Sequence, residues 1–393
     1  MRILLTGATG LLGQNFLLEM IKQYYDNLHD LQIIIMGRNN SKKNICDRIK
    51  IILQNDLINY IDRPNIRLDL IDVLFKKVIK CINFSLDSLD LGINKEDLQK
   101  ISNKKIDIVY HIASLTDFRN DSVTVNNLRK VNIYGTKQLL LICNKLQMEK
   151  IVYISSAYVS GVISGNVAPD YSNLKANFRN EYEKTKLKAE ILVKNYAEER
   201  GIDYQIFRPS TICGRLIEKP LGKVSKYDVF YGWAVFLLKN KIKLEKDIEK
   251  TAEINLRFKA SRDSGLNIIP ADCVAKLLFL ISTQKTKDKY FYLANSQETP
   301  HKLYFSIIID MLHVKGVEMV DFIPKKKNRI EKLYYKTVGN IFSLYINCQK
   351  INFDLSNLEP FLKSNLLSIP KINEDNFRIL MKYAIANNLG IKS

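Results

Sequence analysis

Two segments of the chain hold side chains whose types and spacing suit acid–base chemistry on a carbonyl oxygen. Tyr182 and Lys186 are four residues apart in a helical segment, so their side chains lie one turn apart on the same face. A tyrosine hydroxyl has a pKa near ~10, and a neighbouring ammonium favours the phenolate and lowers that pKa. Ser156 follows an apolar strand upstream and can hold a carbonyl oxygen while Tyr182 protonates it. We therefore predict Ser156, Tyr182 and Lys186 as the catalytic residues.

A glycine-rich turn near the first residue predicts a dinucleotide site. The segment TGATGLLG, residues 6–13, follows a buried strand at 2–5 and opens an amphipathic helix. Gly7 permits a backbone conformation closed to other residues, Gly10 lets the chain approach a pyrophosphate, and Gly13 lets the helix pack close to the sheet. The helix N-terminus adds free N–H groups and positive potential. A glycine triplet also occurs in ordinary strand–helix turns, so the tyrosine–lysine pair downstream carries the prediction of a bound nicotinamide that donates hydride.

The residues after the second strand indicate which nicotinamide cofactor binds. The strand at 31–36 is followed by Gly37 and Arg38, where an NAD-preferring site usually has Asp or Glu. Arg38 can pair with a 2′-phosphate, and Lys42 and Lys43 follow closely. The alternative is a surface arginine that opens a loop. We predict NADP(H) as the cofactor.

The strands that must position these residues are continuous apolar runs that alternate with helical segments. This pattern indicates burial on both faces, as in a parallel sheet covered by helices. We expect strands at 2–5, 31–36, 80–84, 106–110, 150–154, 204–207 and 289–294. The predicted fold is α/β: a doubly wound parallel sheet of the Rossmann type with a smaller, discontinuous α+β substrate domain. The expected domains are an NADP-binding domain at 1–210, completed by about 271–297, and a substrate-binding domain at 211–270 and 298–393.

The composition is that of a globular protein with a substantial core. Of the 393 residues, 46% are hydrophobic. No apolar run approaches the ~18 residues that a membrane-spanning helix needs, and no signal peptide is expected. The six cysteines have no CxxC pairing, and the four histidines are scattered, so we expect neither a metal site nor a disulfide framework. A cytoplasmic location is the simplest expectation.

The formal net charge of +19 leaves two interpretations open. One is an anionic partner: a phosphorylated cofactor, coenzyme A, an acidic carrier protein or, peripherally, a membrane surface. The other is a compositional bias that spreads lysines over the whole surface, which the dispersed basic residues favour. The basic loop at 325–329 has the same two interpretations: either it docks a carrier protein or coenzyme A, or it is only solvated. Without a nucleic-acid-binding motif, we expect no nucleic acid as a partner.

The order of the motifs resembles that of the extended short-chain dehydrogenases/reductases over roughly residues 1–300. Within that superfamily, the chain is similar to the branch that contains fatty acyl-CoA reductases and the thioester reductase domains of carboxylic acid reductases and peptide synthetases. The superfamily motifs are TGATGLLG (6–13), HIAS (111–114), VNIYGT (131–136), YISSAYVSG (153–161), YEKTK (182–186) and FRPSTICG (207–214). The branch motifs are LDLGINKEDL (89–98), SLTDF (114–118) and NIIPADCVA (267–275).

The resemblance implies roles for individual residues. Lys186 would also reach the nicotinamide ribose, and Pro209 with its neighbours would border the nicotinamide. Two positions depart from the family: Ser85 stands where members often carry an Asp that contacts the adenine, and Ser114 where they often carry Ala. The implied cofactor-binding residues are Thr6, Gly7, Thr9, Gly10, Leu11, Leu12, Gly13, Arg38, Ser85, Leu86, Ala113, Ser114, Tyr182, Lys186, Pro209 and Thr211.

Three further features carry expectations about local structure. His111, beside an apolar strand, is expected to be a packed histidine rather than a ligand. A last helix is expected from about Glu374, with Asn373 as its cap. An aromatic stretch between 227 and 237 either lines an acyl-binding channel or packs a core. Its members are Tyr227, Phe230, Tyr231, Trp233, Phe236 and Leu237.

These expectations combine into one leading function and two alternatives. The leading hypothesis is an NADPH-dependent reductase of an acyl thioester, on coenzyme A or a carrier protein, that yields an aldehyde and, after a second round, an alcohol. The first alternative is an extended short-chain oxidoreductase or epimerase acting on a nucleotide sugar or a hydroxysteroid-like alcohol, against which the aromatic stretch argues. The second is a non-catalytic NADP-binding sensor, against which the intact tyrosine–lysine pair argues.

Overall fold

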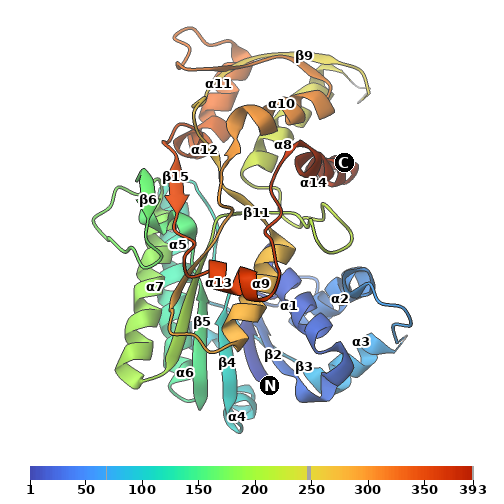
Figure 1. Cartoon of the computed structure of the whole chain (residues 1–393), viewed down its shortest axis with the longest axis vertical. Helices are drawn as coiled ribbons and strands as arrows, with labels where there is room; N and C mark the ends of the chain where they lie inside the picture. Colours follow the sequence, from blue (N-terminus) through green and yellow to red (C-terminus); the bar gives the residue numbers. More distant parts are fainter. Residues whose placement is uncertain (68, 246–248, 392–393) are drawn as a thin grey trace.

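A seven-stranded parallel sheet carries the predicted site residues, with the strand order β12-β7-β5-β4-β1-β2-β3 (Figure 1). The computed structural model describes residues 1–67, 69–245 and 249–391. All the strands expected from the apolar runs are present in this sheet. They are β1 (Arg2–Thr6), β2 (Gln32–Gly37), β3 (Ile79–Asn83), β4 (Ile106–His111), β5 (Met148–Ile154), β7 (Asp203–Pro209) and β12 (Tyr290–Leu293).

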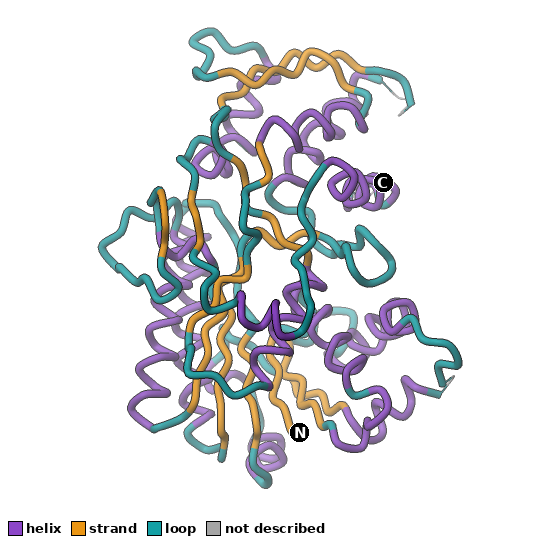
Figure 2. The backbone as a smooth tube through the Cα atoms, in the orientation of Figure 1, coloured by secondary structure: helices purple, strands orange, loops and turns teal. Residues whose placement is uncertain are grey.

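Helices cover both faces of the sheet, because alternate residues of each strand pack into separate apolar cores. One core joins the sheet to α1 (Leu11–Gln23), α2 (Ile45–Ile61) and α9 (Ala271–Thr283). The other joins it to α6 (Gly135–Cys143) and α7 (Glu181–Arg200). The tube in Figure 2 shows the strands enclosed between these two layers. The doubly wound parallel sheet predicted from the sequence is therefore confirmed.

The order of the strands reverses beside β1, and this reversal opens a crevice. From β1 the chain adds β2 and β3 on one side and then returns to place β4 on the other. At such a switch point, the loops that follow the two central strands diverge and leave room for a ligand. The glycine turn follows β1 and the HIAS segment follows β4, so both predicted cofactor segments border this crevice.

A second lobe lies beyond the carboxyl ends of the strands (Figure 1). Its parallel strand pair is β9 (Ala252–Lys259) with β14 (Val314–Val320), packed by α8 (Phe230–Leu244), α10 (His301–Met311), α11 (Arg329–Lys336), α12 (Val338–Ile346) and α14 (Glu374–Ala386). The remaining elements are α3 (Leu70–Val73), α4 (Lys95–Ser102), α5 (Ser122–Leu128), β6 (Gly165–Val167), β8 (Thr211–Cys213), β10 (Gly265–Leu266), β11 (Ile268–Pro270), β13 (Thr299–Pro300), β15 (Ile351–Phe353) and α13 (Glu359–Ser364). Among the described residues, no helix is both long and apolar enough to cross a membrane.

Capping residues fix the ends of α7 and α14, and the sequence analysis predicted two of these ends. Asn180 accepts a hydrogen bond from the backbone of Glu183 at the start of α7, and Gly201 ends that helix with φ +63°. Asn373 caps α14 in the same way, as expected. The cap at Asn180 fixes where α7 begins, and with it the position of Tyr182 and Lys186 in its first two turns.

The C-terminal part of the chain crosses back to the first half. Leu358 is fully buried in the core that holds α1 and α9, and Figure 1 shows α13 next to α9. Phe361 stacks edge-on against Phe291 of β12, with 5.8 Å between the ring centroids. Residues 355–369 therefore pack on the sheet, although the sequence assigns 298–393 to the substrate domain.

A buried carboxylate joins α2 to the segment that leads into the second lobe. Asp56 accepts hydrogen bonds from Arg215, at 3.1 Å, and from Lys223. Arg215 is 1% exposed and also contacts Asn15 at 2.6 Å. A guanidinium at this depth depends on its carboxylate, because an unpaired buried charge is strongly destabilising.

We expect Asp56→Ala to lower the free energy of unfolding by about 3–5 kcal/mol, because it leaves Arg215 buried without its partner. The matched control is Lys219→Ala, which removes an exposed ion pair with Asp62 (2.9 Å) between the same two segments. That change should stay within about 0.5–1 kcal/mol. Urea unfolding of the two variants measures the difference, and equal losses would contradict the role assigned to Asp56.

Candidate active site

A single cavity of about 590 Å³ lies over the crevice and gathers almost all of the predicted site residues. Its walls come from the glycine turn, the carboxyl ends of β2, β4, β5 and β7, the helix α7 and the second lobe. The predicted residues that line it are Gly7, Thr9, Gly10, Leu11, Leu12, Gly13, Arg38, Ser85, Leu86, Ala113, Ser114, Ser156, Tyr182, Lys186, Pro209 and Thr211.

The glycine turn forms a cradle that side chains would fill. Gly7 has φ +81°, and a Cβ there would lie 2.6 Å from the backbone nitrogen of Ala113. A Cβ on Gly13 would lie 2.0 Å from the carbonyl oxygen of Gly7, so α1 can approach the turn only because this position is glycine. Gly10 provides the N-cap of α1 without a side-chain cap, which leaves the first N–H groups of the helix for a ligand. These features fit the pyrophosphate of a dinucleotide.

Thr6 does not line the cavity, so its predicted contact with the cofactor stays a prediction. It is fully buried beneath the turn, where its hydroxyl bonds His111 Nδ1 at 2.9 Å and accepts from the backbone of Ala113 at 3.2 Å. His111 bonds Thr136 through its other nitrogen, at 2.9 Å, and burial lowers the pKa of His111 to about 3. The prediction of a packed histidine is confirmed, and Thr6 supports the loop that the cofactor would touch.

Two arginines and one acid line the end of the cavity next to β2. Arg38 is exposed there, and Arg48 of α2 donates to the carbonyl oxygen of Arg38 at 2.6 Å. The sequence analysis missed Arg48, although its place one turn after Ile45 in an amphipathic helix puts it at the start of α2. Ser85 donates to the carboxylate of Asp87, which also lines the cavity. An acid is therefore present in this part of the cavity, although position 85 itself lacks one.

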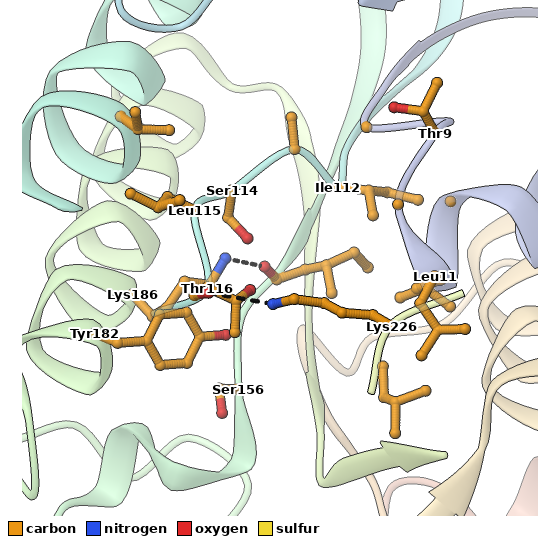
Figure 3. Close-up of a pocket in the computed structure, with 18 of the residues that line it drawn as sticks. Thr9, Leu11, Ile112, Ser114, Leu115, Thr116, Ser156, Tyr182, Lys186 and Lys226 are labelled. Carbon is orange, nitrogen blue, oxygen red and sulfur yellow. Dashed lines mark hydrogen bonds between the residues drawn. The ribbon is translucent and has the colours of Figure 1, made fainter. Parts of the chain in front are cut away.

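The predicted catalytic residues converge at the opposite end, as Figure 3 shows. The phenol of Tyr182 points into the space beside Thr116, above Ser156. Ser156 accepts a hydrogen bond from the backbone of Tyr158 at 3.3 Å. Lys186 is 1% exposed and donates to the carbonyl oxygen of Ile154 at 2.6 Å. The end of β5 and the first turns of α7 thus bring the three side chains to one wall.

Burial controls the ionisation of the tyrosine–lysine pair. Loss of hydration lowers the pKa of Lys186 to about 7, although the carboxylate of Glu190 raises it. Loss of hydration raises the pKa of Tyr182 to about 12, and a hydrogen bond with Thr116 opposes this rise. The expected lowering of the tyrosine pKa is therefore wrong, because burial raises it and the charges of Glu183 and Asp228 raise it further.

Two buried hydroxyls in the cavity lack partners. Ser155 and Ser210, at the ends of β5 and β7, are 3% and 6% exposed, and their hydroxyl oxygens make no hydrogen bond with any residue that the structure describes. Buried polar groups are nearly always paired, so such atoms in a cavity suit a ligand with polar groups of its own. They lie beside Pro209, where the resemblance places the nicotinamide, and this fits its carboxamide.

Lys226, from the second lobe, reaches across the mouth of the cavity. Its ammonium donates to the carbonyl oxygen of Thr116 at 3.2 Å (Figure 3). It also pairs with Asp228. The Thr116 segment is held in turn by Asn132, which accepts from the backbone of Leu115 at 2.7 Å. The sequence analysis missed Thr116 and Lys226, because each lies in a loop without a periodic pattern.

The aromatic residues that line the cavity differ from those expected. Those of the 227–237 stretch pack in the core of the second lobe, where Trp233 is 2% exposed and donates to the hydroxyl of Tyr334 at 3.0 Å. Of the two alternatives that the sequence left open for this stretch, core packing is confirmed and the acyl channel is not. The cavity is lined instead by Phe118, Tyr158, Phe342 and Tyr345.

Residues 5–278 match the family model described as male sterility protein. The chain belongs to this family. It is 28% identical to dTDP-D-glucose 4,6-dehydratase from Dictyostelium discoideum over 54% of this chain and 44% of the relative. It is 26% identical to probable fatty acyl-CoA reductase 5 from Arabidopsis thaliana over 46% of this chain and 35% of the relative. Probable polyketide synthase 34 from Dictyostelium discoideum matches 96% of this chain at 26% identity.

The chain spans less than half the length of these relatives, and only 12% of the polyketide synthase. Their presence confirms the resemblance to extended short-chain dehydrogenases/reductases and to fatty acyl-CoA reductases. The relatives are enzymes of the oxidoreductase, dehydratase and epimerase types, and the family binds NAD or NADP.

Solved structures share the fold at low sequence identity. The terminal R domain from the myxalamid PKS-NRPS biosynthetic pathway superposes with a TM-score of 0.72 at 18% identity, over 98% of this chain and 91% of that one. The thiolation-reductase di-domain from an archaeal non-ribosomal peptide synthetase gives 0.68 at 19% identity, over 99% and 90%. UDP-glucuronic acid 4-epimerase from Bacillus cereus, in complex with NAD, gives 0.61 at 16% identity, over 100% and 99%.

The lowered pKa of Lys186 predicts a pH dependence of stability. Between about pH 7 and the ordinary value of 10.5, the native lysine is neutral while the unfolded lysine is charged, so unfolding takes up a proton. The free energy of unfolding should therefore rise with pH, by up to ~1.4 kcal/mol per unit, and lose this contribution as the pH falls through 7. Relative to Lys186→Met, the wild type should gain stability between pH 7 and 9 in urea unfolding. Parallel curves for the two proteins would contradict the shift.

Proposed function

We propose that the chain is an NADPH-dependent reductase of acyl thioesters, carried by coenzyme A or by a carrier protein. The product is an aldehyde and, after a second round, an alcohol. The observation that carries this proposal is the convergence of the Tyr182 phenol and the Ser156 hydroxyl on a cavity that also holds the glycine cradle. At the reacting end, that cavity is walled by aromatic rings. The similarity to R domains and to a fatty acyl-CoA reductase supports the same reaction class.

The side chains divide the reaction between binding and proton transfer. NADPH supplies the hydride for the thioester carbonyl carbon. Ser156 holds the carbonyl oxygen, and Tyr182 donates its proton there, because burial keeps the phenol protonated near neutral pH. The resulting hemithioacetal breaks its carbon–sulfur bond and releases aldehyde and thiol. Lys186 stays beside the phenol because its ammonium is held by Ile154.

The division of labour between the two lobes follows from this mechanism. We propose that residues 1–210 and 271–297 bind the dinucleotide, and that 211–270 and 298–393 bind the substrate. Lys226, Phe342 and Tyr345 reach the cavity from the second group and meet Tyr182 and Ser156 there. Residues 355–369 are the exception, since they pack on the sheet.

A nucleotide sugar is the competing substrate, since dehydratases and epimerases are among the relatives. Sugar hydroxyls need polar partners around the reacting carbon. Beside Thr116 and Ser156, the wall next to Tyr182 includes the rings of Phe118, Phe342 and Tyr345, and the hydroxyl of Tyr345 is already paired with Glu183 and Asn180. This composition favours an acyl group.

We expect Arg38→Ala to weaken NADPH binding by at least tenfold and to leave NADH binding almost unchanged. The physical reason is loss of the guanidinium that would pair with the 2′-phosphate. The matched control is Arg63→Ala, which removes an exposed arginine paired with Asp26 outside the cavity. Fluorescence titration of both cofactors measures the effect, and equal weakening of NADH and NADPH would reject a 2′-phosphate contact.

Tyr182→Phe should lower NADPH consumption with acyl thioesters by about 10²–10⁴-fold, because it removes the proton donor. The dissociation constant for NADPH should change little. Tyr196→Phe is the matched control on α7, since Tyr196 packs in the core and does not line the cavity. Acyl-CoA, acyl-carrier and sugar-nucleotide substrates are compared under the same conditions. Full activity of the Tyr182 variant, or turnover confined to sugar nucleotides, would refute the proposed function.

A further inference from the structure

The cavity ends beside Tyr182 in a continuous wall of rings, which we call the aromatic box: Phe118, Tyr158, Phe342 and Tyr345. Phe118 stands edge-on to the ring of Tyr182, with 5.3 Å between centroids. It also contacts Phe342 at 5.6 Å and Tyr345 at 5.7 Å. Tyr158 completes the wall through Tyr345, at 5.4 Å. Rings in mutual contact leave no gap through which a chain could continue.

The space behind this wall is filled. Trp233 of α8 packs against Phe342 with 5.1 Å between ring centroids, and against Phe305 at 5.4 Å. Its indole nitrogen is bonded to the hydroxyl of Tyr334. Trp233, from the aromatic stretch at 227–237, therefore packs directly behind Phe342. It fills the space into which a long acyl chain would have to extend past this ring.

The box is also held rigid by polar contacts at its rear. The hydroxyl of Tyr345 donates to Glu183 and accepts from Asn180, both at 2.8 Å. The buried guanidinium of Arg179 lies over the rings of Tyr345 and Tyr158, at 5.3 and 5.6 Å. These contacts fix the ring orientations before any substrate arrives, so the box does not open simply by rotation of its side chains.

Another part of the cavity wall near Tyr182 is charged and partly exposed. Lys226 and Asp228 line the cavity there, and their side chains are 47% and 39% exposed. A thioester has an acyl group on one side of its carbonyl and the arm of its carrier on the other. The arm leads to solvent, so it leaves past Lys226, and the acyl group lies against the aromatic box.

We propose that the aromatic box is an acyl subsite selective for compact, planar acyl groups, aromatic or conjugated and about one ring in size, over long saturated chains. This inference rests on the proposed function. Planar groups present edges and faces that pack well against edge-on rings. A long chain would have to displace Phe342 or fold back over the Lys226–Asp228 pair, which costs hydration of charged groups.

The test measures how well the wild type reduces benzoyl, octanoyl and palmitoyl groups with NADPH. Each group is supplied as its coenzyme A thioester and its N-acetylcysteamine thioester. Benzaldehyde, octanal and hexadecanal, which need no carrier, are measured in the same way. We expect kcat/KM for the benzoyl compounds to exceed that for the palmitoyl compounds at least tenfold. Palmitoyl or hexadecanal turnover equal to or above that of the benzoyl compounds would overturn the aromatic-box inference and leave the reductase function standing. Failure with every thioester and aldehyde would overturn both.

Variants of the box locate the selectivity in its wall. Phe342→Ala should raise the octanoyl-to-benzoyl ratio of kcat/KM at least tenfold, because it opens the box toward Trp233, and Phe342→Leu should give a smaller rise. The matched control is Phe361→Ala, which removes a partly buried ring that packs against the sheet outside the cavity. NADPH titration confirms that each variant is folded. Should Phe342→Ala fold poorly, Phe118→Leu provides the same comparison. An unchanged ratio in folded box variants would overturn the inference.

Discussion

The buried carboxylate of Glu183 is the contact on which the arrangement of the candidate site depends. It follows Tyr182 directly and accepts from the backbone of Arg179 at 3.0 Å and from the hydroxyl of Tyr345 at 2.8 Å. The guanidinium of Arg179 lies 3.4 Å away, and both side chains are completely buried. An ion pair at this depth stabilises little by itself, because desolvation offsets much of the attraction. Its consequence is geometric: the first turn of α7 and the helix α12 cannot shift independently.

The same depth of burial explains the ionisation of the catalytic pair. A lysine with a pKa of about 7 and a tyrosine with a pKa of about 12 are both held toward their neutral forms by loss of hydration. A protonated phenol suits the donation of a proton to a carbonyl oxygen. The spacing of Tyr182 and Lys186 brings them to one helix face, but the depth of that face decides which group is charged. Sequence spacing carries no information about depth, so the expected direction of the tyrosine shift was wrong.

Much of the fold could be predicted from the sequence, because its determinants are local. Apolar runs identified every strand of the sheet, and Gly201 and Asn373 marked helix ends through their own backbone and capping preferences. The glycine turn was predictable for the same reason. Thr6 shows the limit, since its side chain points into the core rather than the cavity. The direction of one side chain at the end of a strand depends on its neighbours in the sheet, here His111 of β4.

The aromatic residues beside Tyr182 could not be predicted from the sequence, for a different reason. Phe118, Tyr158 and Tyr345 come from three distant segments, and none belongs to a periodic pattern that distinguishes it from other aromatic residues. The stretch around Trp233 has such a pattern, but periodicity predicts a buried face equally well for a core and for a channel. The structure separates the two, because Trp233 packs behind Phe342 rather than beside Tyr182.

The two halves of the site therefore constrain function to different degrees. The cradle at Gly7 and Gly13 is formed by the backbone. Relatives named as sugar-nucleotide enzymes and as a fatty acyl-CoA reductase are both similar to this chain. The cradle specifies a dinucleotide and nothing about the second substrate. The second lobe supplies that information through a few side chains, because Glu183 ties its ring at Tyr345 to the turn that carries Tyr182. A substitution in α12 thus changes the wall beside Tyr182 without touching the glycine cradle, whereas a substitution at Glu183 would disturb Tyr182 and the Tyr345 ring together.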